Sequence, residues 1–137
     1  MKLLREQIWG IVFLAVCAAC LISFWMGGAS GDGAMGFSIL WFYIIIPITA
    51  FFTAMMYGRK KSNAKWAFII VCGLMGMILG WATFALANTL SFGHWNIPSF
   101  SDSLFAGIPA LIGMFIGHVG WGTSGDTYAT VDKEKRK

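Results

Sequence analysis

Few side chains in this sequence could carry acid–base chemistry or bind a metal. The candidates away from the charged ends of the chain are His94, Asp102 and His118. His94 and Asp102 belong to a polar segment between apolar runs, whereas His118 lies at the far end of the last run, so they are not expected to share a substrate, as acid–base catalysis requires. A lone His and a lone Asp supply at most half of a tetrahedral metal shell. We therefore expect no enzymatic activity, no metal and no cofactor.

Two short motifs resemble chemical signatures but lack the context that each signature needs. Cys17 and Cys20 form a C-x-x-C, but the redox motif works at an exposed helix N-terminus. Both cysteines lie within an apolar run, and we interpret them as small core residues. Residues 31–36 match G-x-G-x-x-G, but dinucleotide binding also requires a preceding strand and an acidic residue about 20 positions later. Neither is present, so we interpret this stretch as a flexible outer turn.

The elements that must position these residues are membrane spans. The chain of 137 residues is 58% hydrophobic and 12% charged, whereas soluble domains contain about 25% charged residues. Its mean hydropathy is +0.71. Four apolar runs each approach the roughly 20 residues that cross a bilayer. The sequence predicts an all-α bundle of four transmembrane helices, at about 8–26, 37–57, 66–88 and 104–121, followed by a disordered cytoplasmic tail, 122–137.

The positive charge predicts the orientation of the bundle. All ten basic residues fall in three short segments, at the start of the chain, within Gly58–Lys65 and at its end. Short basic loops stay on the cytoplasmic side, so the pattern predicts a multi-pass protein of the cell membrane with both termini in the cytoplasm. No basic face is interleaved with aromatic residues, and nucleic-acid binding is therefore not expected.

Small residues line one face of the third span and one face of the fourth. Each face contains a G-x-x-x-G, formed by Gly76 and Gly80 in the third span and by Gly113 and Gly117 in the fourth. Such faces let two helix backbones approach closely in lipid. These four glycines are therefore predicted to make helix–helix contacts, either within the chain or with a partner.

A few polar or irregular positions interrupt the apolar spans. Pro47 predicts a kink in the second span, and the hydroxyls of Thr49 and Thr53 can bond carbonyls of the preceding turn. Trp81 is the one mid-span tryptophan, and Asn88 ends the third span. His118 is interpreted as an interfacial histidine with no second titratable group at its depth. The predicted spans contain no Asp, Glu, Lys or Arg.

The order of these features resembles a known kind of protein. The likeness rests on the basic start, the string Phe37–Tyr43, Pro47, the basic turn and the string Ala82–Asn88. It resembles small four-span bacterial integral membrane proteins of unassigned function. The resemblance implies the fold and transfers no activity.

Two functions are compatible with this sequence. The first hypothesis is an accessory or assembly subunit that docks another membrane protein, or a second copy, through the small-residue faces. The alternative is an oligomeric transporter or channel for a small solute, with a path along a set of polar and irregular positions: Pro47, Thr49, Thr53, Trp81, Asn88 and His118. A charged residue inside the membrane would favour the transporter, and its absence from the predicted spans favours the subunit.

Overall fold

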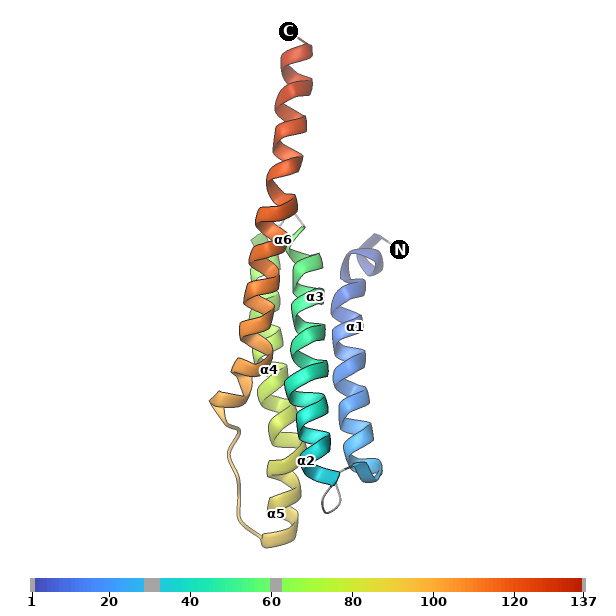
Figure 1. The fold of residues 1–137 in the computed structure, drawn as a ribbon, viewed down its shortest axis with the longest axis vertical. Coiled ribbons are helices and arrows are strands. Elements are labelled where there is room, and N and C mark those ends of the chain that lie inside the picture. The colour runs from blue at the N-terminus through green and yellow to red at the C-terminus, as the bar shows by residue number, and fades with distance from the viewer. Residues whose placement is uncertain (1, 29–32, 60–62, 137) are drawn as a thin grey trace.

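The structure is a computed structural model that describes residues 2–28, 33–59 and 63–136, nearly all of them helical (Figure 1). The first two helical stretches are α1 (Lys2–Ser23) with the π-helical η1 (Phe24–Gly28), then α2 (Gly33–Ser38), the π-helical η2 (Ile39–Ile45) and α3 (Ile46–Gly58). The last two are the 3₁₀ turn η3 (Asn63–Trp66), α4 (Ala67–Gly80), the π-helical η4 (Trp81–Ala85) and α5 (Leu86–Phe92), then α6 (Phe100–Lys135).

Four of these helical stretches are long and apolar enough to cross a membrane: Gln7–Gly27, Gly33–Gly58, Ala64–Phe92 and Phe100–Gly120. The predicted all-α fold with four spans is confirmed. The second and third spans are several residues longer than predicted, and the fourth begins four residues earlier. Of the flexible outer turn predicted at residues 31–36, positions 31 and 32 lie outside the described residues, and α2 already begins at Gly33.

The bundle is built around α3 and α4. Both contact α6 extensively, and both contact α1. Figure 1 shows α1 and α6 on opposite sides of α3, and both chain termini at the same end of the bundle. The chain therefore crosses the bundle in alternating directions, as four consecutive spans require.

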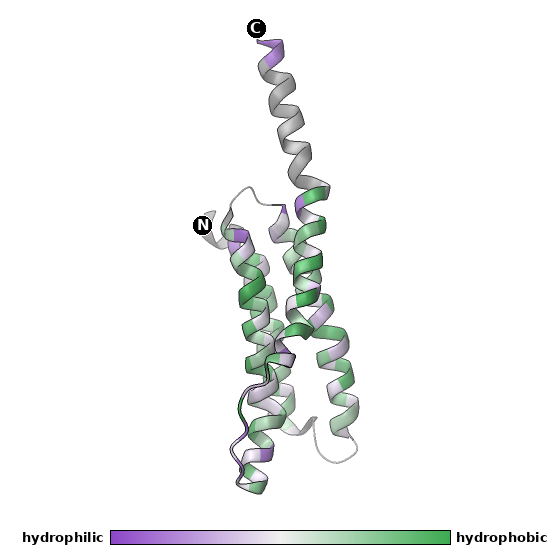
Figure 2. Ribbon diagram, turned by 90° about the vertical axis from the view of Figure 1, so that its left-hand side faces the viewer, coloured by the Kyte–Doolittle hydropathy of each residue, from purple (hydrophilic) through white to green (hydrophobic). Residues whose placement is uncertain are grey.

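The core and the outer faces of the bundle differ in side-chain size. Buried positions combine a few large side chains with small ones, such as Phe13 and Leu79 beside Cys17 and Ala110. All three cysteines are buried and unbonded. Large aliphatic and aromatic side chains face outward, and Figure 2 shows hydrophobic residues along the bundle with hydrophilic ones gathered at its ends. Lipid solvates such an exterior directly, because its chains are as apolar as these side chains.

The connection between α5 and α6 determines where the fourth span begins, which is nearer the middle of the bundle than the tip of α5. Gly93 ends α5 with a φ of +72°, the left-handed conformation that glycine adopts most readily at a helix C-terminus. Residues 93–99 then run back toward the centre of the bundle, and α6 begins well above the tip of α5 (Figure 1). The first turn of α6 thus packs on one side against the third span through Asp102 and Ser103, instead of belonging to the outer segment predicted from the sequence.

The C-terminal tail differs from the sequence prediction. A disordered segment is expected from Gly122, whereas α6 continues as a helix to Lys135 and projects from the bundle (Figure 1). The tail contains no proline, and its last residues are Lys, Glu and Arg, which are good helix formers. The cations at this end also interact favourably with the helix dipole.

Candidate functional site

The small-residue faces predicted from the sequence pack within the chain. A side chain at Gly113 or Gly117 would meet the α3 backbone at Phe51 or Met55. On the other side of α6, Gly76 lies against Ala106 and the backbone of Asp102. These glycines therefore make the predicted helix–helix contacts, and their faces are covered by helices of the same chain.

The irregular turn before α3 has a local cause. Pro47 stands in the first turn of α3, directly after the π-helical η2. Proline has no N–H to donate, and its ring conflicts with the carbonyl four residues earlier, at Tyr43, so the preceding turn widens. The hydroxyl of Thr49 donates to the Ile45 carbonyl at 2.7 Å, and that of Thr53 donates to the Thr49 carbonyl at 2.6 Å. Both hydroxyl protons are thus used by the helix itself.

Trp81 anchors the segment that connects α5 to α6. Its indole N–H donates to the Asn96 carbonyl at 2.9 Å, and its ring lies 6.5 Å from that of Trp95. The Asn96 side chain donates in turn to the Ala85 carbonyl at 3.4 Å. Trp81 is therefore a packing anchor, and Asn88, which is exposed, lies outside this contact.

The inner end of the bundle, where both termini lie, holds a compact polar cluster that the sequence analysis did not foresee. Lys65 is only 6% exposed, and its Nζ donates to the Gly58 carbonyl at 3.1 Å and lies 2.8 Å from His118 Nδ1. An ammonium has only donors, so Nδ1 accepts. The Trp66 ring meets His118 edge-on at 5.9 Å. The prediction that no titratable group shares the depth of His118 is corrected by Lys65, which η3 directs back over the end of α3.

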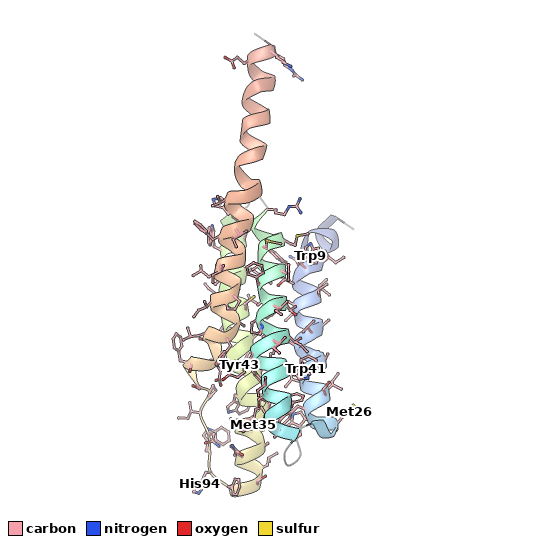
Figure 3. The ribbon with its side chains drawn as sticks, viewed as in Figure 1. Trp9, Met26, Met35, Trp41, Tyr43 and His94 are labelled. Carbon is pink, nitrogen blue, oxygen red and sulfur yellow. The ribbon has the colours of Figure 1, made fainter. Side chains whose placement is uncertain are left out.

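The outer half of the bundle contains a cavity of about 190 Å³ between the second, third and fourth spans. Four of its seven lining residues are aromatic, and the full set is Ser38, Phe42, Tyr43, Gly80, Phe84, Asp102 and Phe105. Two of its walls are π-helical, since η2 supplies Phe42 and Tyr43 and η4 supplies Phe84. Such widened turns occur frequently at functional sites. Figure 3 shows Tyr43 on the side of the second span that faces the start of α6.

Asp102 is the charged residue of this cavity. It lies in the first turn of α6, and its carboxylate occupies the space that a side chain at Gly80 would need. Its backbone N–H donates to the Ser99 carbonyl at 3.2 Å. Among the residues that the structure describes, none donates a hydrogen bond to the Asp102 carboxylate and no cation pairs with it.

The depth of Asp102 can be judged along α6. Asp102 and His118 are separated by 16 positions in one helix, which corresponds to roughly 24 Å at 1.5 Å per residue. The hydrocarbon core of a bilayer is about 30 Å thick. Asp102 falls within the candidate span Phe100–Gly120, near the end opposite His118. The expectation that no carboxylate lies within a span is therefore corrected.

A local signal for this carboxylate was present in the sequence. Ser99 and Asp102 form the pattern Ser-x-x-Asp immediately before an apolar run, which is typical of a helix N-terminus. Hydropathy alone predicts that the span begins at Leu104 and that Asp102 lies in the loop. The structure begins α6 at Phe100, with Ser99 at the N-cap, and this shift of one turn brings Asp102 into the bundle.

His94 does not join either polar group. It follows α5 at the outer tip of the molecule, away from the start of α6 (Figure 3). In the parts of the chain that the structure describes, no group of three or more His, Cys, Asp or Glu side chains is arranged to hold a metal ion. The two candidate sites are therefore the inner Lys65–His118 cluster and the outer Asp102 cavity.

Comparison of the chain with protein-family models, curated proteins and solved structures gave no match. A fold of four spanning helices hosts many activities, so the function must be argued from the site.

Proposed function

We propose that this protein binds a small solute inside the membrane and moves it across, as the alternative hypothesis of a small transporter or channel states. The observation that carries this proposal is the Asp102 carboxylate, which lines an open cavity at membrane depth without a partner among the described residues. Ionisable side chains inside a membrane are costly and usually mark ion or substrate paths. A charged residue inside a span is the feature expected to separate transport from docking. Asp102 is such a residue, and it supports transport over docking.

The packing of the glycines also lowers the rank of the subunit hypothesis. A partner cannot use the faces of Gly113, Gly117 and Gly76 while helices of the same chain cover them. Those faces were the main reason to expect docking.

The proposed transporter is an oligomer. The cavity is confined to the outer half of the bundle, while the inner half is closed where Gly58 meets the backbone of α6 and where Lys65 meets His118. One copy therefore provides a binding site, and a second copy beside it would supply the remaining surface of a path.

Reconstituted vesicles test the transport proposal. Purified protein is adsorbed as proteoliposomes on a solid-supported membrane, and charge movement is recorded after concentration jumps of Na⁺, K⁺, methylammonium and benzylammonium. We expect charge movement with at least one cation, its loss in Asp102→Asn, and its retention in Glu134→Gln, a matched change at an exposed position on α6. No charge movement with any of these cations, or equal signals in all three proteins, would contradict the proposal.

The second candidate function is that of an accessory subunit, and it rests on a different observation from the glycine faces. Beyond Gly120 the helix α6 continues for a further 15 residues to Lys135, clear of the bundle (Figure 1), and a projecting helix of this kind offers a surface to a partner. Recovery of a membrane protein by mild-detergent pull-down with the full chain, but not with a chain ending at Gly122, would support it. Equal recovery with both chains would remove it.

We also propose that both termini are cytoplasmic, because the basic segments lie at the end of the bundle where the termini lie (Figure 1). Cysteines at Asp32 and Ser62, two positions outside the described residues, report the two faces of the membrane. A membrane-impermeant thiol reagent should label Asp32→Cys from outside intact cells and leave Ser62→Cys unlabelled. The parent chain, whose three cysteines are buried, is the control. The opposite pattern would reverse the topology.

A further inference from the structure

We propose that the Asp102 cavity binds a small primary ammonium ion with an aromatic or similar apolar group. This inference names the ligand class and rests on the proposed function of the same cavity. Its basis is the combination of one carboxylate with four aromatic rings in a space of about 190 Å³.

The charge of the ligand follows from the carboxylate. A charge removed from water needs pairing and hydrogen bonds to be stable. Asp102 is partly buried, and among the described residues none pairs with it. A cation with N–H donors supplies both the opposite charge and the hydrogen bonds. A neutral or anionic ligand would leave the carboxylate unpaired or place a second negative charge beside it.

Aromatic rings form most of the wall and favour an organic cation. Tyr43 and Phe105 meet edge to face at 4.9 Å, and Phe42 lies 6.1 Å from Phe84. The faces of such rings attract cations at distances up to about 6 Å. Phe84 is in turn held by Phe24, whose ring lies 5.0 Å away. This wall is therefore supported by the core of the bundle.

The Ser38 hydroxyl, one of two hydroxyls in the cavity, can accept a hydrogen bond from the ligand. The Ser38 hydroxyl donates to the Ala34 carbonyl at 3.0 Å, so its proton is used within the helix and its oxygen is left to accept. The cavity thus presents acceptors to the ligand at Asp102 and Ser38. A primary ammonium, with three N–H donors, matches two such acceptors.

The size and chemistry of the cavity argue against two other occupants. Ca²⁺ requires six to eight oxygen ligands, whereas this cavity offers one carboxylate and two hydroxyls among aromatic rings. Drug-sized ligands occupy pockets of roughly 300–1,000 Å³, larger than this one. A single ring with a short ammonium arm is the size that fits, and benzylammonium is a suitable probe.

Gly80 makes room for the carboxylate. A Cβ at this position would collide with the tip of the Asp102 side chain, so only glycine lets Asp102 lie against the third span. Gly80 is thus a positioning residue of the cavity as well as a packing residue.

Isothermal titration of the purified protein in detergent tests the inference without any variant. Benzylammonium and benzyl alcohol have nearly the same shape and differ in charge, and heats from empty micelles are subtracted. We expect benzylammonium to bind at least tenfold more tightly than benzyl alcohol. Equal affinities in the unmodified protein would overturn the inference.

Variants locate the binding site. Asp102→Asn should reduce benzylammonium affinity to that of the alcohol, while Glu134→Gln should leave it unchanged. Phe84→Leu should weaken binding several-fold, whereas Phe92→Leu, at a 74% exposed position at the end of α5, should not. Benzylammonium affinity that survives in Asp102→Asn would contradict the site.

The outcomes separate this inference from the proposed function. Benzylammonium binding that depends on Asp102, without charge movement in proteoliposomes, would keep the ligand class and remove transport. Charge movement with Na⁺ or K⁺, without a preference for benzylammonium over benzyl alcohol, would keep transport and overturn the ligand class.

Discussion

Lys65 and Asp102 are the two charged side chains within the candidate spans, and their surroundings differ. Lys65 lies at the inner end, almost fully buried, and its ammonium contacts the Gly58 carbonyl and His118. Asp102 lies in the outer half, and its carboxylate faces a cavity without a donor among the described residues. A satisfied polar group fixes the arrangement of the helices around it. Asp102 has no such partner among the described residues, and the ligand that we propose would supply one.

The glycine contacts also differ in whether the glycine meets a backbone or a side chain. In the inner half, Gly113 and Gly117 bring α6 against the backbone of α3. In the outer half, Gly80 faces the movable tip of a side chain. The contacts at Gly113, Gly117 and Gly76 are therefore expected to be rigid, and the contact at Gly80 to tolerate change.

The largest expected effect sharpens this contrast in packing. Gly117→Leu should destabilise the protein by about 3 kcal/mol, the upper end of the usual cost of overpacking, because the Met55 backbone cannot yield to the added side chain. Thermal unfolding in detergent measures the loss. Ile116→Leu, at a lipid-facing position, should melt like the parent chain, and Gly80→Leu should fall between the two. Equal melting of Gly117→Leu and Ile116→Leu would show that this face does not pack as described.

A smaller effect is expected at Lys65, whose ammonium has hydrogen-bond partners. Lys65→Met keeps the length of the side chain but removes the donor to Gly58 and His118, and hydrogen bonds to charged groups contribute about 1.5–3 kcal/mol. Thermal unfolding in detergent should show a loss of that size, with Lys135→Met, at an exposed position near the end of α6, as the matched control. If both variants melt alike, the inner cluster does not stabilise the bundle and the contrast with Asp102 fails.

The smallest effect is expected at Asp102, whose carboxylate has no partner among the described residues. Asp102→Asn breaks no hydrogen bond to a described residue, and relief of the charge burial opposes the loss of a favourable helix-dipole interaction of about 0.3–1 kcal/mol. We therefore expect a stability change below about 1 kcal/mol, measured by the same unfolding assay. A loss as large as that of Lys65→Met would mean that the carboxylate holds the fold together.

The sequence predicted the parts of the structure that depend on patterns within one helix. Four apolar runs gave the four spans, and the spacing of Gly113 and Gly117 gave a close helix crossing. Which helix they meet depends on tertiary packing, and nothing in the local pattern showed that α3 would fill that face. The small-residue faces could therefore be predicted from the sequence, but the helix that packs against them could not.

Both charged residues were missed for a related reason. Lys65 and Asp102 stand within a few residues of a predicted span boundary, where hydropathy cannot distinguish a residue in water from one enclosed by neighbouring helices. A shift of one helical turn, about 5.4 Å, decides between these two environments. The depth of Asp102 depends on where residues 93–99 lead the chain, and that depends on the contacts that Asn96 makes with Trp81 and Ala85.

The projecting end of α6 changes what the C-terminal charges can act on. From Gly120 to Lys135 the helix rises roughly 22 Å at 1.5 Å per residue, while the Debye length at physiological ionic strength is about 8 Å. Lys135 and Arg136 are exposed at this distance. In the orientation that we propose, salt would screen these cations strongly from anionic headgroups at the foot of the helix. The terminal cations act only on what approaches them from the surrounding solution.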